Sequence, residues 1–338
     1  MITKLIDYLE KNRKLFKIPE NEKIAIELHP PWRKSHNGTC QYIVYVGKKR
    51  IETIVIRESI SLYGIRCRCN PYKPQFSEDV DNFLPENKGS FSLNNKEYYW
   101  SDRIQEKTLM SIISENPRDP DTWKLVSDFF HKFSSTQIEN SVLSSDFYDE
   151  LKELINQKIK QKEGTLVFEE FCDLNILKFN DQKKVPCSWS HGDLWSQDIF
   201  LVGTSWRIID WEYSLQVAPI GSDMIDLYIT LAEHNLKMST PDAWRGFWYN
   251  EIPQLSKLRE DIFSVWSTAG FDDEQEKSTY KYALIRSVGR IISQEGETNK
   301  LDLKVYSQII FEVTDKKIHT PLSVIQHIFR LIRNRYRI

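Results

Sequence analysis

Three aspartates, Asp193, Asp198 and Asp210, lie within one short stretch of the sequence and have side chains suited to phosphoryl transfer. Two carboxylates that meet at one spot repel each other unless a cation lies between them, and a few hard oxygen ligands suit Mg²⁺ that bridges phosphates. A third carboxylate nearby can accept the proton of a hydroxyl group. Phosphoryl transfer uses this combination, because positioning and charge neutralisation provide most of its catalysis. Asp198 and Asp210 are therefore the candidate metal ligands, and Asp193 is the candidate base.

The residues around these aspartates predict a β-hairpin that brings two of them together. Apolar runs at 199–202 and 206–209 are separated by Gly203-Thr204-Ser205, a pattern typical of two short strands and a turn. Asp198 precedes the first strand and Asp210 follows the second. Folding the hairpin places these two residues roughly opposite each other, with Cβ atoms about 5 Å apart. The remaining aspartate then lies on the loop that leads into the hairpin.

The same stretch resembles a known family. HGDLWSQD followed by IIDWE is similar to the H-G-D-x-x-x-x-N and I-D-W/F-E motifs of the aminoglycoside phosphotransferase and choline kinase-like family. The resemblance implies a protein-kinase-like fold with two lobes, Mg²⁺ as cofactor, and ATP as phosphoryl donor, with GTP as the alternative donor. It implies that Asp193 is the catalytic base, that Asp198 occupies the metal-binding Asn position and that Asp210 is the principal Mg²⁺ ligand. His191 would brace the loop, and Asp223 in APIGSDMIDL would be a structural acid.

The elements that must position these residues fall into two parts, and the predicted fold class is α+β. Short runs rich in β-branched residues predict a small antiparallel sheet in the N-terminal part, and helical spacing of apolar residues dominates the C-terminal part. We predict an N-terminal lobe at 1–102 and a helical lobe at 103–338. The predicted strands are 24–28, 41–46, 52–57 and a hairpin at 90–100; the predicted helices are 3–16, 103–113, 122–133, 224–233 and 280–292.

Two residues outside the aspartate stretch are candidates for nucleotide binding. YVGKKRIETIVIRES resembles the family's third strand, which ends in a Lys or Arg that holds the α and β phosphates, and this makes Arg57 the candidate. Its partner on a following helix should be a glutamate, and Glu106 in IQEKTLMSII fits that pattern. A solvent-facing strand end is an alternative role for Arg57.

Two departures from the family pattern leave a second function open. Asp198 stands where Asn is usual, which keeps oxygen coordination but adds a negative charge. The segment 32–40 has a single glycine, so it lacks a glycine-rich phosphate loop. A catalytically weak, pseudokinase-like protein that binds nucleotide or a protein partner is therefore the main alternative. A metal-dependent phosphohydrolase is a third possibility, since clustered acids with Mg²⁺ also activate water.

Composition limits the partners. Among 338 residues the net charge is only −2, which does not favour nucleic acid or a membrane surface, and no apolar run is long enough for a membrane span. Five cysteines without zinc-type spacing fit a reducing cytoplasm. The expected partner is a small-molecule hydroxyl substrate: a sugar, an amino alcohol or an aminoglycoside. Asp226, Glu233 and Asp242 are candidates for binding a cationic acceptor, or they are ordinary surface residues. The oligomeric state stays open.

Overall fold

The computed structural model describes residues 2–29, 41–47, 51–58, 83, 87–117, 119–136, 140–159, 162–176, 184–209, 213–295 and 303–314. The chain divides into two units. The first unit combines Met1–Ile138 with Ser188–Ala218, and the second combines Glu139–Cys187 with Pro219–Ile338. The loop that carries Asp193 and Asp198 thus belongs to the same unit as the N-terminal part of the chain. The lobe boundary predicted after residue 102 stays a prediction.

A five-stranded antiparallel sheet forms the N-terminal part of the first unit. The strands are β1 (Ile24–His29), β2 (Gln41–Val46), β3 (Ile51–Glu58), β4 (Asn87–Leu93) and β5 (Lys96–Asp102), in the order β1-β2-β3-β5-β4. All neighbouring strands are antiparallel, and every strand predicted from the sequence is confirmed. Asn94 and Asn95 form the turn between β4 and β5 with φ of 54° and 60°. A two-residue type I′ turn needs positive φ at both positions, which asparagine tolerates better than most residues.

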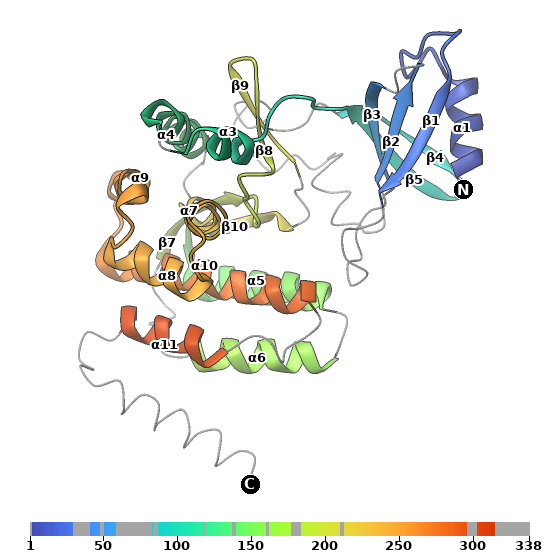
Figure 1. The fold of residues 1–338 in the computed structure, drawn as a ribbon. Coiled ribbons are helices and arrows are strands. Elements are labelled where there is room, and N and C mark those ends of the chain that lie inside the picture. The colour runs from blue at the N-terminus through green and yellow to red at the C-terminus, as the bar shows by residue number, and fades with distance from the viewer. Residues whose placement is uncertain are drawn as a thin grey trace. The chain divides into compact units, whose positions relative to one another are not determined.

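Helix α1 (Ile2–Lys11) packs on this sheet beside β1 (Figure 1). Leu5 and Leu9 point from the helix into a core that includes strand residues such as Val44, Ile56 and Trp100. Burial of this apolar face, rather than helix propensity alone, stabilises such a short helix.

Helix α1 is shorter than the helix predicted over 3–16. It ends at Lys11, and the side-chain amide of Asn12 donates a hydrogen bond of 2.8 Å to the carbonyl oxygen of Tyr8. The same oxygen also accepts from the backbone N–H of Asn12 at 3.1 Å, so this residue closes the helix end with both its backbone and its side chain. The chain then turns, and Phe16 packs back into the same core.

Two helices follow the sheet in the first unit, α3 (Leu109–Glu115) and α4 (Pro120–Ser135). The helix predicted over 103–113 is therefore wrong in its first half. Thr108 sets the true start, because its side-chain oxygen accepts a hydrogen bond from the backbone N–H of Ser111 and caps the helix. The helix predicted over 122–133 is confirmed as α4, which begins with Asp119 as N-cap and Pro120 in its first turn.

The second unit is mainly helical. Its elements are β6 (Asn140–Leu143), α5 (Ser144–Lys158), α6 (Lys162–Ile176), α7 (Ser222–Leu236), α8 (Thr240–Tyr249), η3 (Pro253–Leu255), α9 (Ser256–Thr268), α10 (Asp273–Glu295) and α11 (Leu303–Thr314). Helix α10 lies along α5 and also contacts α6, α7 and α11, which makes it the centre of the unit (Figure 1). The helices predicted at 224–233 and 280–292 are confirmed within α7 and α10. The division between the units falls within β7 (Lys184–Ser190) and β10 (Leu215–Pro219), which form a three-stranded sheet with β6 in the order β10-β7-β6.

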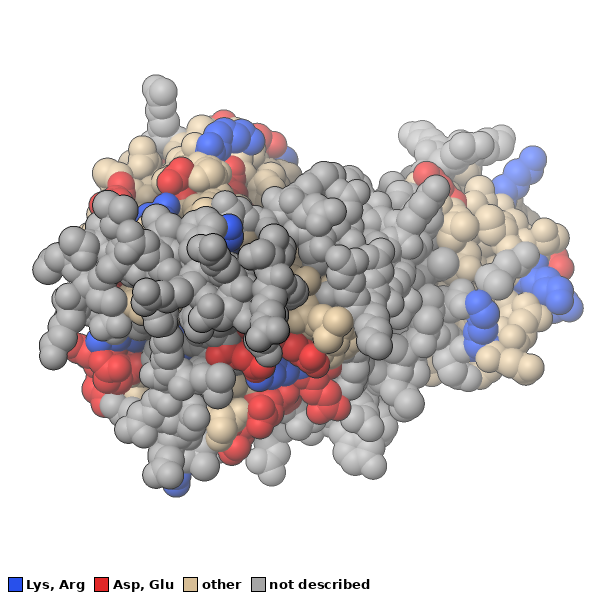
Figure 2. Space-filling model, turned by 90° about the horizontal axis from the view of Figure 1, so that it is seen from below, with Lys and Arg blue, Asp and Glu red and all other residues tan. Residues whose placement is uncertain are grey.

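Charged side chains of both signs share the surface. On the face that Figure 2 shows, Asp and Glu side chains are interspersed with Lys and Arg. Lys152 of α5 and Asp173 of α6 form one such exposed pair, at 3.5 Å. None of the helices in the described part of the chain has the length and apolar character needed to cross a membrane.

Candidate active site

The loop from Ser190 to Asp198 alternates buried anchors with accessible polar groups. Strand β7, which precedes the loop, is buried along its whole length except at its first residue. His191, Leu194 and Ser196 are buried, whereas Asp193, Trp195 and Asp198 are half-buried. The buried residues fix the path of the backbone and leave two carboxylates within reach of a solute. A loop held in this way can present polar side chains in defined positions.

Gly192 is the one residue of this loop that must lack a side chain. Its φ is +82°, and a Cβ atom built on it would lie 1.9 Å from the carbonyl oxygen of Tyr213. Its N–H donates to the hydroxyl oxygen of Ser190 at 3.1 Å. Only glycine combines the left-handed backbone with so close an approach of another chain segment. The glycine in the H-G-D motif therefore has a steric cause.

His191 connects the loop to the end of the hairpin. Its Nε2 lies 2.9 Å from the carbonyl oxygen of Ile209, and its Nδ1 lies 3.4 Å from the backbone nitrogen of Asp193. Because a carbonyl only accepts, Nε2 must carry the hydrogen, and Nδ1 is then the acceptor of the Asp193 N–H. His191 therefore uses both nitrogens as a neutral brace, in agreement with the role that the resemblance implied.

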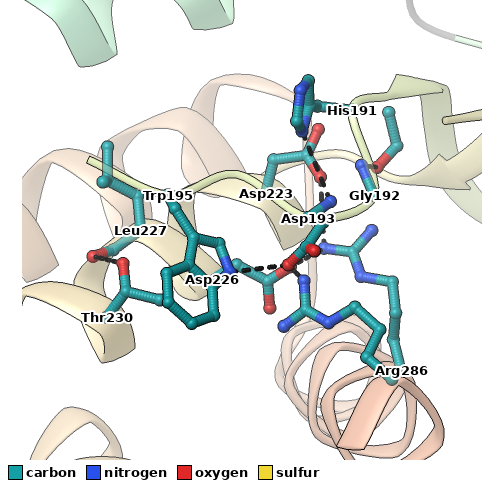
Figure 3. Close-up of polar contacts among 11 residues, drawn as sticks. His191, Gly192, Asp193, Trp195, Asp223, Asp226, Leu227, Thr230 and Arg286 are labelled. Carbon is teal, nitrogen blue, oxygen red and sulfur yellow. Dashed lines mark hydrogen bonds and ion pairs between the residues drawn. The ribbon is translucent and has the colours of Figure 1, made fainter. Parts of the chain in front are cut away.

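Asp193, the predicted base, has a specific neighbour on the same loop. The indole Nε1 of Trp195 donates to Oδ1 of Asp193 at 2.6 Å, and Figure 3 shows the indole directed at this carboxylate. Trp195 lies between Asp193 and Asp198 in the sequence. No pattern in the sequence specifies that contact, because it depends on the path of the loop backbone.

The predicted hairpin is present as β8 (Ile199–Val202) and β9 (Ser205–Ile208). Its turn has two residues, Gly203 and Thr204, one fewer than predicted, and Gly203 has φ of +61°. Ile199 pairs with Ile208, and the backbone N–H of Ile209 donates to the carbonyl oxygen of Asp198 at 2.9 Å. Asp198 thus lies directly opposite the residue that precedes Asp210. Asp210 itself lies outside the described residues, so its carboxylate stays a prediction.

Aromatic side chains pack against the hairpin and hold it in place. Trp206 is buried and meets Phe129 of α4 edge to face, with ring centroids 5.3 Å apart. Phe83 packs against the same phenylalanine, and its carbonyl oxygen accepts a hydrogen bond of 2.7 Å from the N–H of Ile208. The hairpin that carries Asp198 is therefore fixed to the body of the first unit.

The two predicted nucleotide-binding residues have different outcomes. Arg57 lies at the end of β3, where its backbone pairs with Gln41 of β2 and Tyr99 of β5, but its side chain lies outside the described part. Glu106 was expected on a helix and is instead an exposed residue of the segment before α3, with its carboxylate accepting from the N–H of Gln105 at 3.1 Å. Glu106 lies outside the helix because α3 begins only after its N-cap, Thr108. A pairing between Arg57 and Glu106 stays a prediction.

A second group of acids lies in the second unit, on α7. Asp223 and Asp226 are buried, and the guanidinium of Arg286 on α10 lies 3.2 Å from the first carboxylate and 2.7 Å from the second. Arg290, one turn further along α10, lies 3.0 Å from Asp226. Burial alone would lower the pKa of Arg286, but the attraction of both carboxylates raises it above its ordinary value. These residues form an ion network, which fits the structural role predicted for Asp223.

The candidate acceptor-binding acids do not form a group of accessible carboxylates. Asp226 is only 1% exposed and belongs to the ion network, so its prediction as a surface or acceptor-binding residue is wrong. Asp242 lies in the first turn of α8, where its carboxylate and backbone N–H both bond the side chain of the N-cap, Ser239. Its position is explained by capping. Glu233 is half-buried near the end of α7.

The residues present fit a magnesium ion in their chemistry. Asp198 supplies a half-buried carboxylate oxygen, and the hairpin register brings its backbone beside the residue that precedes Asp210. Within the described residues no group of three or more His, Cys, Asp or Glu side chains could hold a metal ion. Asp210 lies outside that part of the chain.

Comparison with known proteins gives the fold. No protein-family model matches the sequence, and no curated protein matches it. A thermostable mutant of an aminoglycoside phosphotransferase in its apo form matches with a TM-score of 0.51 at 11% identity, over 93% of this chain and 99% of that chain. A further mutant of that protein, in ternary complex with AMP-PNP and hygromycin B, matches with a TM-score of 0.52 at 11% identity, over 94% of this chain and 100% of that chain. A choline/ethanolamine kinase family protein from Mesorhizobium loti has 13% identity and a TM-score of 0.45, over 97% of this chain and 100% of that chain.

The chain therefore has the two-lobed α+β fold of protein-kinase-like phosphotransferases, as predicted. This fold agrees with the one that the resemblance of the H-G-D and I-D-W-E motifs implied. At these identities it says nothing about the substrate. Function must be argued from the site.

Proposed function

We propose that the chain is a kinase that transfers the γ-phosphoryl group of ATP, with GTP as the alternative donor, to a hydroxyl group of a small molecule. One observation carries this proposal. A half-buried carboxylate, Asp193, lies on a braced loop that leads into a hairpin, and the hairpin register sets Asp198 opposite the residue before Asp210. A base beside a pair of metal-binding carboxylates is the arrangement that phosphoryl transfer needs.

In this proposal the hydroxyl oxygen of the acceptor bonds to the γ-phosphorus, and the bond between that phosphorus and the bridging oxygen of the departing ADP breaks. Asp193 accepts the proton of the hydroxyl group. Asp198 and Asp210 would hold Mg²⁺, which neutralises phosphate charge when bound. His191 keeps the backbone of Asp193 in place through its neutral Nδ1. Arg57 remains the proposed contact to the nucleotide phosphates, and Glu106 remains its proposed partner.

The acceptor is proposed by chemical class as a sugar, an amino alcohol or an aminoglycoside. Hygromycin B is bound together with AMP-PNP in a solved structure of similar fold, so it is one of the compounds to test. We place the reaction in the cytoplasm, where ATP and Mg²⁺ are present and cysteines stay reduced. Cys172 and Cys187 are free thiols, which fits that environment.

Calorimetric titration tests the donor site first. ATP and GTP, each with and without Mg²⁺, are titrated into the wild type and into Asp210→Ala. The proposal expects nucleotide binding that depends on Mg²⁺ in the wild type and is weakened in the variant. No binding to the wild type would overturn the kinase assignment.

An acceptor panel then tests transfer. Hygromycin B, glucosamine, choline and ethanolamine are incubated with the wild type and MgATP, and ADP release is followed with and without each compound. Release that requires one of them identifies the acceptor class. Release of phosphate into water with no dependence on any alcohol would instead favour the metal-dependent phosphohydrolase.

Asp198 itself favours a second candidate, a catalytically weak nucleotide-binding protein. A carboxylate in place of an amide adds a negative charge where phosphate must approach. Under this alternative the wild type binds MgATP but transfers phosphate slowly, and Asp198→Asn raises the rate of transfer. A decrease in that variant would favour the active kinase, because it would show that the carboxylate assists the reaction.

A further inference from the structure

The loop of the candidate base contains a tryptophan whose placement the motif does not explain. Trp195 follows Asp193 by two residues and is half-buried. Its indole Nε1 lies 2.6 Å from Oδ1 of that carboxylate (Figure 3). A hydrogen bond to a carboxylate at this distance is short and has charge-assisted character. A buried hydrophobic role alone would not require this contact.

The backbone on either side of Trp195 is held independently of its side chain. Leu194 and Ser196 are both buried, and the carbonyl oxygen of Ser196 accepts a hydrogen bond of 2.9 Å from the N–H of Met110 in α3. The carbonyl oxygen of Trp195 accepts another of 2.9 Å from the N–H of Asp198, which closes a turn before β8. These contacts fix the Cα of Trp195, so two side-chain torsions bring the indole to the carboxylate.

The chemistry of the indole group suits a positioning role. Its N–H is a donor that never accepts, so it stabilises an ionised carboxylate and cannot take up the proton that the base removes. A rigid ring with two torsions also loses little conformational freedom when it makes this contact. Lysine at the same position would add a positive charge, and histidine would add a second group that can take up and release a proton.

We propose that Trp195 is a positioning residue for the reaction. By holding Oδ1 of Asp193, its indole N–H keeps the base in one orientation toward the acceptor hydroxyl. This inference rests on the proposed function, because it assigns a role within the same reaction. It predicts that loss of the N–H slows the chemical step without weakening nucleotide binding, since Trp195 acts only through Asp193.

Spectroscopy tests the contact without any turnover. The ten tryptophans of the full chain are labelled with ¹⁵N in the indole, and the Trp195 resonance is identified by its loss in Trp195→Phe. A hydrogen bond to a carboxylate moves the indole proton downfield. Asp193→Ala should therefore move the Trp195 proton upfield and leave that of Trp123, whose indole donates to the carbonyl oxygen of Pro117, in place. No response of the Trp195 resonance would overturn the proposal.

Kinetics test the role. In Trp195→Phe, with MgATP and the acceptor panel described above, we expect kcat to fall about tenfold or more while KM for ATP stays within about twofold, the loss expected for a hydrogen bond to a charged group. Trp123→Phe loses an indole hydrogen bond elsewhere on the first unit and should keep wild-type kinetics.

The outcomes separate the two proposals. Transfer by the wild type with unchanged kcat in Trp195→Phe overturns the positioning role alone. Absence of any transfer by the wild type overturns the kinase assignment and the positioning role with it, even if the resonance responds. If Trp195→Phe aggregates, Trp195→Leu, which also lacks the indole N–H, replaces it for both the assignment of the resonance and the kinetics.

Discussion

Asp193 and Asp226 are the same amino acid in two opposite environments. Asp193, in the first unit, is half-buried and receives a hydrogen bond from the neutral indole of Trp195. Asp226, in the second unit, is almost fully buried and contacts the guanidinium groups of Arg286 and Arg290 at 2.7 and 3.0 Å. A neutral donor orients a carboxylate through its hydrogen bond, whereas two buried guanidinium groups supply a carboxylate with counter-charges. Identical side chains can therefore serve chemistry in one place and packing in the other.

The comparison extends to the surroundings of each residue. The loop of Asp193 is fixed by backbone contacts, so its side chain can change without loss of the fold. In the second unit, Asp223 and Asp226 balance the charges of Arg286 and Arg290 between α7 and α10, so removal of one partner leaves a buried charge uncompensated. Activity should depend on the first aspartate and stability on the second.

The largest effect is expected on activity in Asp193→Asn. The amide keeps the size and the hydrogen bond from Trp195 but cannot accept the acceptor proton, so kcat should fall about 10³-fold. The free energy of unfolding should change by less than about 1 kcal/mol, because the side chain is half-buried and the loop has other anchors. Rates of ADP release and urea unfolding curves measure both.

Asp128→Asn is the control for this substitution, because Asp128 is an exposed residue of α4. It should change neither quantity. Equal losses of kcat in the two variants, or a loss of stability that matches the loss of activity in Asp193→Asn, would break the comparison by showing that Asp193 is structural.

The next effect is expected on stability in Asp226→Asn. The amide leaves Arg286 and Arg290 with one buried carboxylate fewer, and breaking such a buried pair costs about 3 kcal/mol of unfolding free energy. The surface pair between Lys152 and Asp173 provides the matched control. Asp173→Asn should cost less than about 0.5 kcal/mol, because exposed ion pairs are screened by water. Urea unfolding of both variants gives the comparison, and equal losses would contradict a structural network.

Much of the fold was predictable because it follows from local patterns. Alternation of β-branched residues gave the strands of the sheet, helical spacing gave α4, α7 and α10, and Gly203 gave the turn of the hairpin. The ends of elements were less predictable. Thr108 caps α3 and thereby leaves Glu106 outside the helix, a competition between capping and helical pattern that apolar spacing does not reveal.

The contacts that decide the roles of the aspartates were not predictable from local patterns. Asp226 was a candidate surface acid, and its burial depends on arginines of α10 that lie far along the chain. A signal was present, since acids three residues apart on α7 and Arg286 and Arg290 four residues apart on α10 each define one helix face. The contact between Trp195 and Asp193 has no such signal, because the bond from Met110 to Ser196 helps to set the loop path.

A smaller effect is expected from a methyl group at Gly192. In Gly192→Ala the Cβ would meet the carbonyl oxygen of Tyr213, and a left-handed alanine adds backbone strain, so unfolding free energy should fall by about 2–3 kcal/mol. Gly203→Ala is the control, because Gly203 also has positive φ but nothing lies within 4 Å of its added Cβ. It should cost only about 1 kcal/mol, from backbone strain. Similar losses measured by urea unfolding would show that the close approach does not determine the path of the loop.

The smallest effect on stability is expected from two buried thiols of the second unit as the pH rises. It compares the buried interior of that unit with the accessible loop of Asp193. Burial raises the pKa of Cys172 and of Cys187 from 9.0 to about 12. The unfolded chain releases these protons near pH 9, whereas the folded chain keeps them until about pH 12, so the stability they contribute is complete below pH 9 and is lost as the pH rises toward 12. At pH 9 the loss is about 0.4 kcal/mol for each thiol.

Two measurements check this behaviour. Peptide mapping after iodoacetamide treatment at pH 8 should find both cysteines unmodified in the folded protein and modified in urea, because only the thiolate reacts. Urea unfolding at pH 8 and pH 9 should show this fall in stability, and Cys172→Ala should lose the part that comes from its own thiol while Cys187 keeps its share. Modification of either cysteine in the folded protein at pH 8 would mean that water reaches the interior of the second unit. The difference between an accessible Asp193 and a buried helical interior would then no longer explain why Asp193 is suited to catalysis and Asp226 to structure.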